Sequence, residues 1–501
     1  MTGRARLNIQ LAGGMLMLLA LPFLVARLDS VPAAWSGEGA YLQGAKNVAL
    51  YGKYALLSGG EFRHVDPILT GAGPTVLLPV AAVFRLFGVG LVQARVVSVL
   101  YALAAIWLCS NLAARMVGER AAVVATALMV WSPWGSFVLM GRLAVGQMPS
   151  LAFMLLGLYL WWGSMDRDPI WRPLGSGVAL GLASFSDQRS IVVLGALLLV
   201  GAADAAYYRR LGFRRWGIPF LVAVLSLAVW LCCLASVGGL SGWLSNLQTY
   251  SLATVFRPSR VLANFNNLAR SGYLLWAVPA IAYLGLEMVR KRRDGLRECT
   301  LLAVICVWLL WFVLGSIGWV LYAFVPISLS SLLLARLFGD VTDDFRFDVH
   351  RLREALGEAS ISPLLARCSL ALIPLFAIGY GVLVDVDAIL HEGNKSAQQM
   401  ADYLDAHVAS DALVETGEWE ISFLSQKRFH HPPFHVLDAL TRRDQLGVAP
   451  EGEPYSPEPF RPDYLVDGPW SGWARLYDEY VERDCALETA VGPYTLYACA
   501  Q

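Results

Sequence analysis

The chain has 501 residues, of which 56% are hydrophobic and only 16% are charged. About a quarter of the residues of a soluble globular domain are charged, so this composition excludes an ordinary soluble fold. The formal net charge is zero, and we therefore expect no nucleic-acid partner. The 17 tryptophans suit membrane–water interfaces. We predict an all-α polytopic membrane protein.

The first predicted element is the apolar run Leu7–Val25, which follows Arg4 and Arg6. A membrane-spanning helix needs roughly 20 apolar residues, so this run is long enough to span. A signal peptide cleaved near residues 31–34 is the alternative. The run is long for the apolar core of a signal peptide, so we expect an uncleaved first helix.

The first outer loop, residues 29–92, contains Glu38 between two glycines. Ser36 is the expected N-cap of a short amphipathic helix on the membrane surface, since Leu42 and Ala45 begin an apolar pattern at helical spacing. The start of a helix favours an ionised carboxylate, so Glu38 is suited to accept a proton. The alternative is that Glu38 only caps the helix. Residues 74–87 form a second apolar stretch, too short to span, which predicts an interfacial or re-entrant helix.

Hydropathy predicts about eleven spanning helices in all. Arginine clusters alternate along the chain consistently with this count. We expect an integral protein of the cytoplasmic membrane, and the positive-inside rule places its N-terminus in the cytoplasm. An odd number of spans then puts residues 391–501 outside. The ten ranges after the first are 94–116, 120–140, 148–165, 173–187, 190–208, 217–237, 272–289, 299–316, 318–335 and 367–389.

The C-terminal segment, 391–501, is more polar than the membrane domain, 1–390, and predicts a small extracytoplasmic α/β domain. We expect helices at 396–407 and 473–481, and strands at 412–415, 464–466 and 494–499. Cys485 and Cys499 are its only cysteines, in an oxidising compartment. We predict a disulfide that ties the last strand to the preceding helix.

Several charged residues of the outer loops are suited to an anionic ligand. Asp187 and Arg189 lie at the junction of two spans, where charges face a cavity or pair with each other. Residues 241–271 carry three arginines and no acid, which suits a phosphate or lipid headgroups. Arg142 is a single arginine after a short outer loop. It could bind a phosphate, or its charged end could extend to the membrane surface while its aliphatic part stays among apolar residues. No cysteine–histidine cluster indicates a metal site, and we expect no metal or other cofactor.

Several short motifs follow one another in the N-terminal part of the chain. They are Trp35-Ser36-Gly37-Glu38-Gly39-Ala40-Tyr41, Ala45-Lys46-Asn47, Gly73-Pro74-Thr75-Val76-Leu77-Leu78-Pro79, Phe84-Arg85-Leu86-Phe87-Gly88-Val89-Gly90, Arg95 and Gly141-Arg142-Leu143-Ala144. Taken in this order, they resemble the GT-C superfamily of membrane glycosyltransferases. The subgroup most similar is the protein mannosyltransferase and aminoarabinose-transferase type, and the resemblance covers mainly residues 1–190.

This resemblance implies an inverting transfer of a sugar from a polyprenyl-phosphate donor to an acceptor hydroxyl of a glycan, lipid or protein outside the membrane. It makes Glu38 the candidate general base. Asp66 is the reserve candidate, because it lies on the same loop and could reach the same cavity. The family commonly has an acid at the position of Gly37 and often another at that of Gln147, and Arg189 stands where relatives have a lysine.

The chemistry of the implied reaction assigns the remaining site residues. Fixed cations stabilise a departing phosphate, and a base serves the acceptor hydroxyl. The expected phosphate ligands are Arg142, Arg189, Arg257, Arg260 and Arg270, and the expected substrate-binding residues are Tyr41, His64, Gln147 and Asp187.

Two other functions stay open at this point. A transporter or flippase of lipid-linked sugars would carry related halves and broken helices, and we find no such halves. A catalytically degenerate relative, acting as a subunit of an envelope assembly, would fit Gly37 and Gln147.

Overall fold

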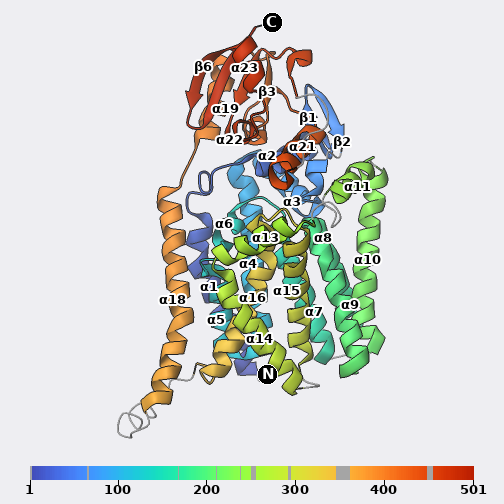
Figure 1. Ribbon diagram of the computed structural model, residues 1–501, viewed down its shortest axis with the longest axis vertical. Coiled ribbons are helices and arrows are strands. Elements are labelled where there is room, and N and C mark those ends of the chain that lie inside the picture. The colour runs from blue at the N-terminus through green and yellow to red at the C-terminus, as the bar shows by residue number, and fades with distance from the viewer. Residues whose placement is uncertain are drawn as a thin grey trace.

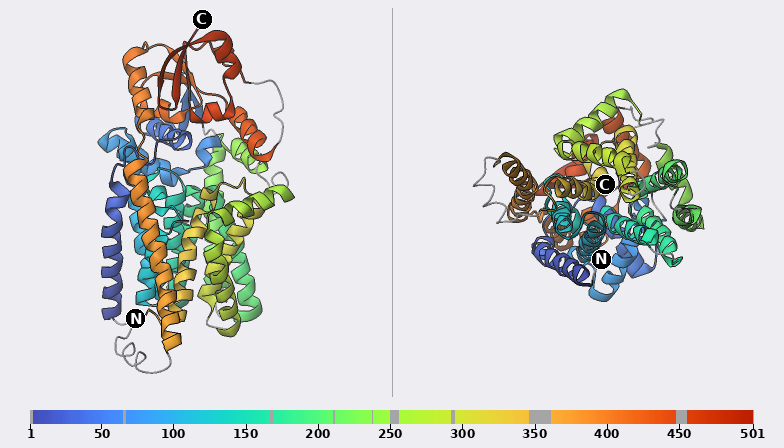
Figure 2. Two further views of the ribbon diagram at one scale, coloured as in Figure 1. Left: turned by 60° about the vertical axis from the view of Figure 1, so that its left-hand side comes forward. Right: turned by 90° about the horizontal axis from the view of Figure 1, so that it is seen from below.

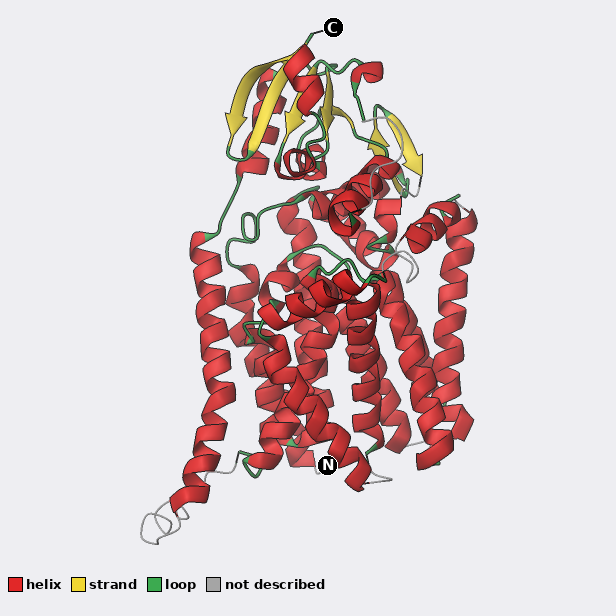
Figure 3. Ribbon diagram, viewed as in Figure 1, coloured by secondary structure: helices red, strands yellow, loops and turns green. Residues whose placement is uncertain are grey.

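The N-terminus and the C-terminus lie at opposite ends of a long helical bundle in the computed structural model of the protein (Figure 1). A small mixed sheet stands at the C-terminal end, and the other strands form a hairpin beside it (Figure 3). The placement of the termini agrees with an odd number of membrane crossings. The structure describes residues 3–64, 67–166, 169–209, 212–236, 238–249, 256–291, 295–345, 361–447 and 455–500.

Each of the eleven predicted spans falls on a helix, and these helices run side by side between the two ends of the bundle (Figures 1 and 2). In the described residues, eight helices are long and apolar enough to cross a membrane. Helices α1, α5 and α8 are shorter in their apolar part, so the count of eleven stays a prediction. The eleven are α1 (Gly3–Val25), α4 (Leu91–Val117), α5 (Glu119–Trp131), α7 (Gln147–Asp166), α8 (Trp171–Ser186), α9 (Val192–Ala203), α10 (Gly212–Ser236), α14 (Tyr273–Lys291), α15 (Leu296–Gly315), α16 (Phe324–Val341) and α18 (Ile361–His391).

Small residues let neighbouring helices approach closely. A Cβ atom at Gly177 of α8 would lie 2.7 Å from the Pro219 carbonyl oxygen of α10. Trp161, Trp162 and Trp308 are among the largest fully buried side chains of the bundle. Packing of this kind is typical of helices in membranes, where close van der Waals contact replaces the hydrophobic effect.

Shorter elements cover the end of the bundle that carries the C-terminal domain, which we call the outer end after the predicted orientation (Figure 1). The helix over 74–87 is confirmed as α3. These elements are α2 (Ser36–Tyr51), α3 (Pro74–Phe87), α6 (Phe137–Arg142), α11 (Leu240–Thr249), α13 (Pro258–Arg270), the hairpin β1 (Ala55–Ser58) and β2 (Glu61–His64), and the single turns η1 (Pro67–Thr70), η2 (Gln188–Ile191) and η5 (Val320–Ala323). One more short element, the π-helical η3 (Asp204–Tyr208), directly follows α9.

The C-terminal domain has a mixed five-stranded sheet in the order β4-β3-β5-β7-β6, in which β3 pairs in parallel with β4 and β5. The predicted α/β character of this domain is therefore confirmed. Its elements are α19 (Ser396–His407), β3 (Leu413–Thr416), α20 (Trp419–Leu424), β4 (Arg428–His430), α21 (Phe434–Leu446), η6 (Glu458–Phe460), β5 (Tyr464–Asp467), α22 (Pro469–Ala474), α23 (Asp478–Asp484), β6 (Cys485–Val491) and β7 (Tyr494–Cys499).

Two expectations for this domain are wrong in detail. The helix predicted over 473–481 is divided in two, because Arg475 adopts a left-handed conformation with φ of 53° between α22 and α23. Cys485 and Cys499 do form a disulfide, with an S–S distance of 2.06 Å. They are paired in the register of β6 and β7, so the bond joins two adjacent strands and not a helix and a strand.

The C-terminal domain docks on the first outer loop through α2 and α20. A Cβ atom at Gly39 would lie 2.2 Å from the Glu420 backbone nitrogen, so only glycine permits this approach. Ser36 is not the N-cap, because its hydroxyl donates to the Gly417 carbonyl at 3.2 Å and Trp35 precedes the helix. The polar face of α2 therefore contacts protein: the Gln43 amide donates to the Ser422 hydroxyl at 3.2 Å. The expected helix on the membrane surface is instead held between the bundle and the C-terminal domain.

Candidate functional site

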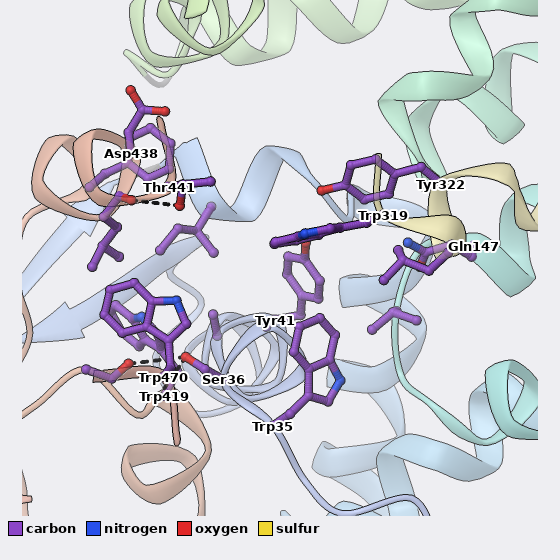
Figure 4. A pocket seen from close by; sticks show the side chains of 18 of the residues that line it. Trp35, Ser36, Tyr41, Gln147, Trp319, Tyr322, Trp419, Asp438, Thr441 and Trp470 are labelled. Atoms are coloured by element: carbon purple, nitrogen blue, oxygen red, sulfur yellow. Dashed lines mark hydrogen bonds between the residues drawn. The ribbon is translucent and has the colours of Figure 1, made fainter. Parts of the chain in front are cut away.

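A cavity of about 230 Å³ lies where the outer end of the bundle, α2 and the C-terminal domain meet. We call it the first cavity. Figure 4 shows most of its side chains, which come from segments spread over the whole chain. Its lining residues are Trp35, Ser36, Gly37, Ala40, Tyr41, Ile68, Val145, Gln147, Arg189, Trp319, Leu321, Tyr322, Gly417, Trp419, Phe434, Leu437, Asp438, Thr441 and Trp470.

Aromatic side chains dominate this lining. Tyr41, Trp319 and Tyr322 face the same space in Figure 4, and Trp35 lies beside them. A largely apolar wall with a few polar groups is typical of a small-molecule site. Aromatic rings with a polar edge suit a sugar, which presents C–H faces and hydroxyl groups together.

Arg189 supplies a fixed cation to the first cavity. Its Nε donates to the Asp187 carboxylate at 2.6 Å, and its guanidinium lies 3.8 Å from the centre of the Tyr322 ring. The same carboxylate accepts a bond from the Arg189 backbone N–H at 3.0 Å, which closes the η2 turn. Within the described structure, Nη1 of Arg189 is buried and makes no hydrogen bond. The guanidinium is thus held in place and keeps a donor for an anionic ligand.

Two expected substrate residues, Tyr41 and Gln147, also line the first cavity. Burial raises the pKa of Tyr41 above its ordinary value, so the phenol is neutral and able to donate a hydrogen bond. The Gln147 side chain stands at the start of α7, and within the described residues its Oε1 is buried and makes no hydrogen bond. A buried amide of this kind is suited to a ligand hydroxyl.

Glu38 does not fit the expected role of general base. Arg95 donates from Nε to Oε1 at 3.0 Å and from Nη2 to Oε2 at 2.6 Å. The Ala144 backbone N–H also donates to Oε1, at 2.9 Å. The Glu38 side chain is fully buried and does not line the first cavity. A base must reach the proton that it removes, whereas this carboxylate joins α2 to α4.

Arg142 is likewise held away from the first cavity. Its guanidinium donates to the carbonyls of Phe23, Ala26 and Val31, the last at 2.9 Å. These carbonyls lie in and after the last turn of α1, where backbone acceptors have no partner inside the helix. The prediction that Arg142 points into the donor site is therefore wrong: a fully buried Arg142 caps the first helix.

The three loop arginines predicted as phosphate ligands do not line the first cavity. Arg257, Arg260 and Arg270 lie in or next to α13 and are not among its lining residues. The predicted convergence with Arg142 and Arg189 is thus wrong. His64 ends β2, and Asp66 lies outside the described residues.

The Trp35 ring lies beside Gly37, the position where the GT-C resemblance leads one to expect a second carboxylate. A Cβ atom at Gly37 would lie 2.5 Å from the Trp35 ring, so the indole covers the space beside residue 37. Among the described residues lining the first cavity, Asp438 is the one carboxylate. Figure 4 shows it at the edge, directed away from Tyr41. Arg442, one turn further along α21, lies 3.1 Å from it.

The sequence analysis did not identify Asp438, Trp319, Tyr322, Trp419 or Trp470 as site residues. Tyr322 lies in the η5 turn and Trp319 directly precedes it, and the other three belong to the C-terminal domain. None stands in a motif, and tryptophan is common throughout this chain. Trp319 and Tyr322 fall at the start of the predicted span 318–335, and the other three fall in the segment assigned outside the membrane, so no local signal set them apart.

Comparisons with known proteins agree with this architecture. Residues 72–236 match the family described as dolichyl-phosphate-mannose-protein mannosyltransferase. The structure of ArnT from Cupriavidus metallidurans bound to undecaprenyl phosphate is 15% identical, with 97% of each chain covered and a TM-score of 0.66. The archaeal oligosaccharyltransferase AglB from Archaeoglobus fulgidus, in complex with an inhibitory peptide and a dolichol-phosphate, is 12% identical. That match covers 98% of this chain and 74% of AglB, with a TM-score of 0.62.

No curated protein matches this chain in sequence. ArnT and AglB are both GT-C glycosyltransferases, so the resemblance to this superfamily is confirmed at the level of the fold. The fold is an ArnT-like membrane bundle with a small C-terminal sheet domain.

Proposed function

We propose that the protein is a membrane glycosyltransferase that takes a sugar from a polyprenyl-phosphate donor and transfers it, with inversion, to an acceptor hydroxyl outside the cytoplasmic membrane. One observation carries this proposal: an aromatic cavity with a fixed arginine lies at the outer end of a GT-C bundle. The similar structures of ArnT and AglB contain undecaprenyl phosphate and dolichol-phosphate, which supports a polyprenyl-phosphate donor.

The proposed reaction uses Arg189 as the cation for the donor phosphate. The acceptor oxygen attacks the anomeric carbon opposite the phosphate, the bond from this carbon to the phosphate oxygen breaks, and the phosphate leaves with the electron pair. Arg189 stabilises the charge that develops on the phosphate. The stacked Tyr322 ring and the Asp187 carboxylate hold the guanidinium for this purpose.

The acceptor proton needs a base, and we assign this role to Asp438 in place of Glu38. Asp438 lies at the edge of the first cavity, whereas Glu38 is enclosed by Arg95 and Ala144. The role requires the Asp438 side chain to rotate toward the acceptor, since it is directed away from Tyr41 (Figure 4). Reaction without a metal or other cofactor stays a prediction, checked by adding a chelator to the assay.

A second function is favoured by one specific observation. Gly37 provides no carboxylate, and Glu38 is tied to Arg95, so the motif at residues 35–41 offers no free base. A protein that binds a lipid-linked sugar without transferring it, as a subunit of an envelope assembly, would need none.

Purified protein supplied with radiolabelled polyprenyl-phosphate sugars and a membrane extract distinguishes these functions. We expect labelled product from the wild type and a loss of about 10²-fold in Asp438→Asn. The control is Arg442→Gln, which removes the partner of Asp438 but retains the carboxylate. Donor binding without any transfer would support the subunit function. Normal transfer by Asp438→Asn would rule out Asp438 as the base.

A further inference from the structure

A second cavity of about 760 Å³ lies between the C-terminal half of α2, the segment that follows α20, and the start of α4. It shares no lining residue with the first cavity. The N-terminal half of α2 faces the first cavity and its C-terminal half faces the second. The second cavity is therefore a separate site on the same interface.

Cations, and no carboxylate, line the second cavity in the described part of the chain. The cations are Lys46 of α2 and Lys427 and Arg428 of the C-terminal domain. Lys427 donates to the Val408 carbonyl at 2.6 Å, and Arg428 donates to the Gly59 carbonyl at 2.7 Å. Neutral carbonyls do not cancel the charge, and each side chain has further N–H donors.

Lys46 is half-buried against the backbone of the C-terminal domain. Its Nζ donates to the carbonyls of Phe423 and Ser425, at 3.1 and 3.3 Å. Burial lowers the pKa of Lys46, and the charge of Asp405 opposes this only in part. Asp405 is turned to other partners, since it accepts bonds from the Ser425 hydroxyl and the Gln426 backbone N–H. An anion in the cavity would offset the cost of burying this ammonium group.

The edge of the second cavity is apolar and continues onto an exposed apolar surface. Leu50, Val89 and Leu91 belong to its lining. Next to them, at the end of α3, Leu86 and Phe87 are 76% and 71% exposed. In Figure 1, α2 and α3 lie at the junction of the bundle and the C-terminal domain, level with the outer ends of the spanning helices. The site therefore combines positive charge with an apolar side at the expected membrane surface.

We propose that the second cavity binds the phosphate headgroup of an anionic membrane lipid, whose acyl chains lie along Leu86 and Phe87. Lys46, Lys427 and Arg428 bind the phosphate. The bound lipid bridges the first outer loop and the C-terminal domain, and so stabilises their docking. The inference does not depend on sugar transfer.

Native mass spectrometry of the full-length, delipidated protein in detergent tests the site. The probes are dihexanoyl phosphatidylglycerol, dihexanoyl phosphatidylcholine and inorganic phosphate. We expect phosphatidylglycerol to bind at least about tenfold more tightly than the zwitterionic lipid, and to raise the unfolding temperature. The double variant Lys427→Gln/Arg428→Gln is expected to lose about tenfold in affinity for it.

The matched control is Lys53→Gln, which removes an exposed cation just after α2 and outside the cavity. It should bind phosphatidylglycerol like the wild type. Because Lys427 and Arg428 also bond the backbone, the single variants are measured too, each alongside its thermal unfolding. Equal binding of the two lipids, or wild-type affinity in folded variants, would overturn the proposal. Inorganic phosphate bound as tightly as phosphatidylglycerol would also overturn it, in favour of a site for free phosphate.

Discussion

Arg95 holds both carboxylate oxygens of Glu38, at 3.0 and 2.6 Å, and the two side chains are completely buried. Arg95 also donates to the carbonyls of Leu28 and Pro32. One ion pair thus connects the segment after α1 with α2 and α4. The residue that the sequence motif suggests as a catalyst is, in the structure, a structural element of the first outer loop.

Glu38→Gln should therefore destabilise the protein, because it leaves the Arg95 cation buried without its counter-ion. Removing one partner of a buried ion pair costs about 3–5 kcal/mol, whereas replacing both partners by apolar residues is often tolerated. Thermal unfolding in detergent should show a large loss in Glu38→Gln and partial recovery in Glu38→Leu/Arg95→Met. An unchanged unfolding temperature together with lost transfer would return Glu38 to the role of base.

Arg189→Gln should lower sugar transfer by about 10²–10³-fold, because it removes the fixed cation that faces the departing phosphate. The assay is transfer from a polyprenyl-phosphate sugar, with donor binding measured separately. Arg270→Gln, an exposed arginine at the end of α13, is the control and should transfer like the wild type. If the two variants lose the same amount, the effect of Arg189 is not specific to the first cavity.

The stability of the protein should depend on pH through Glu418 and Glu420 in the C-terminal domain. Burial, followed by the charge of Glu418, raises the pKa of Glu420 well above its ordinary 4.5. Above about pH 4.5 the unfolded state releases this proton, whereas the folded state keeps it bound up to the raised pKa. Stability should consequently fall as the pH rises from about 4.5 toward the raised pKa.

Glu420→Gln isolates this effect, because its amide oxygen still accepts the bond that the Tyr494 hydroxyl makes to Glu420 at 2.8 Å. The variant should match the wild type near pH 4.5 and be more stable at neutral pH. Unfolding temperatures measured across this range provide the test. Glu479→Gln, an exposed glutamate of α23, should keep the wild-type dependence. A variant Glu420→Gln with the same pH dependence as the wild type would contradict this account.

Loss of the disulfide should destabilise the C-terminal domain. Cys485 and Cys499 are 14 residues apart, and closing a loop of this size contributes ~3 kcal/mol in the chain-entropy model. Cys485→Ser should lower the unfolding temperature of the non-reduced protein, while Cys232→Ser, at an exposed free cysteine, should not. An equal response of wild type and Cys485→Ser to a reducing agent would count against the bond.

The orientation in the membrane is tested with protease added to intact spheroplasts. We expect removal of residues 391–501 and protection of the N-terminus, because the positive-inside rule places the N-terminus in the cytoplasm. Breaking the cells open should expose both ends and serves as the control. A protected C-terminal domain would invert the arrangement and place the first cavity on the cytoplasmic side.

Local patterns in the sequence determined most of the helices. The ranges 74–87 and 396–407 agree with α3 and α19 at both ends, and every predicted span falls on a helix. Apolar runs and helical periodicity act over neighbouring residues, so the sequence alone displays them. The charge at the junction of two spans and the GT-C resemblance together predicted Arg189, Gln147 and Tyr41 as site residues, and all three line the first cavity.

Tertiary structure alone decided what the charged residues do. Glu38 and Arg142 look alike as isolated charges beside apolar segments, but Arg95 encloses one and the end of α1 takes up the other. Trp319 and Asp438 are 119 positions apart in the numbering and meet only because the C-terminal domain docks on the bundle. The role of a polar side chain depends on the partners that folding brings to it, and those partners lie far away in the sequence.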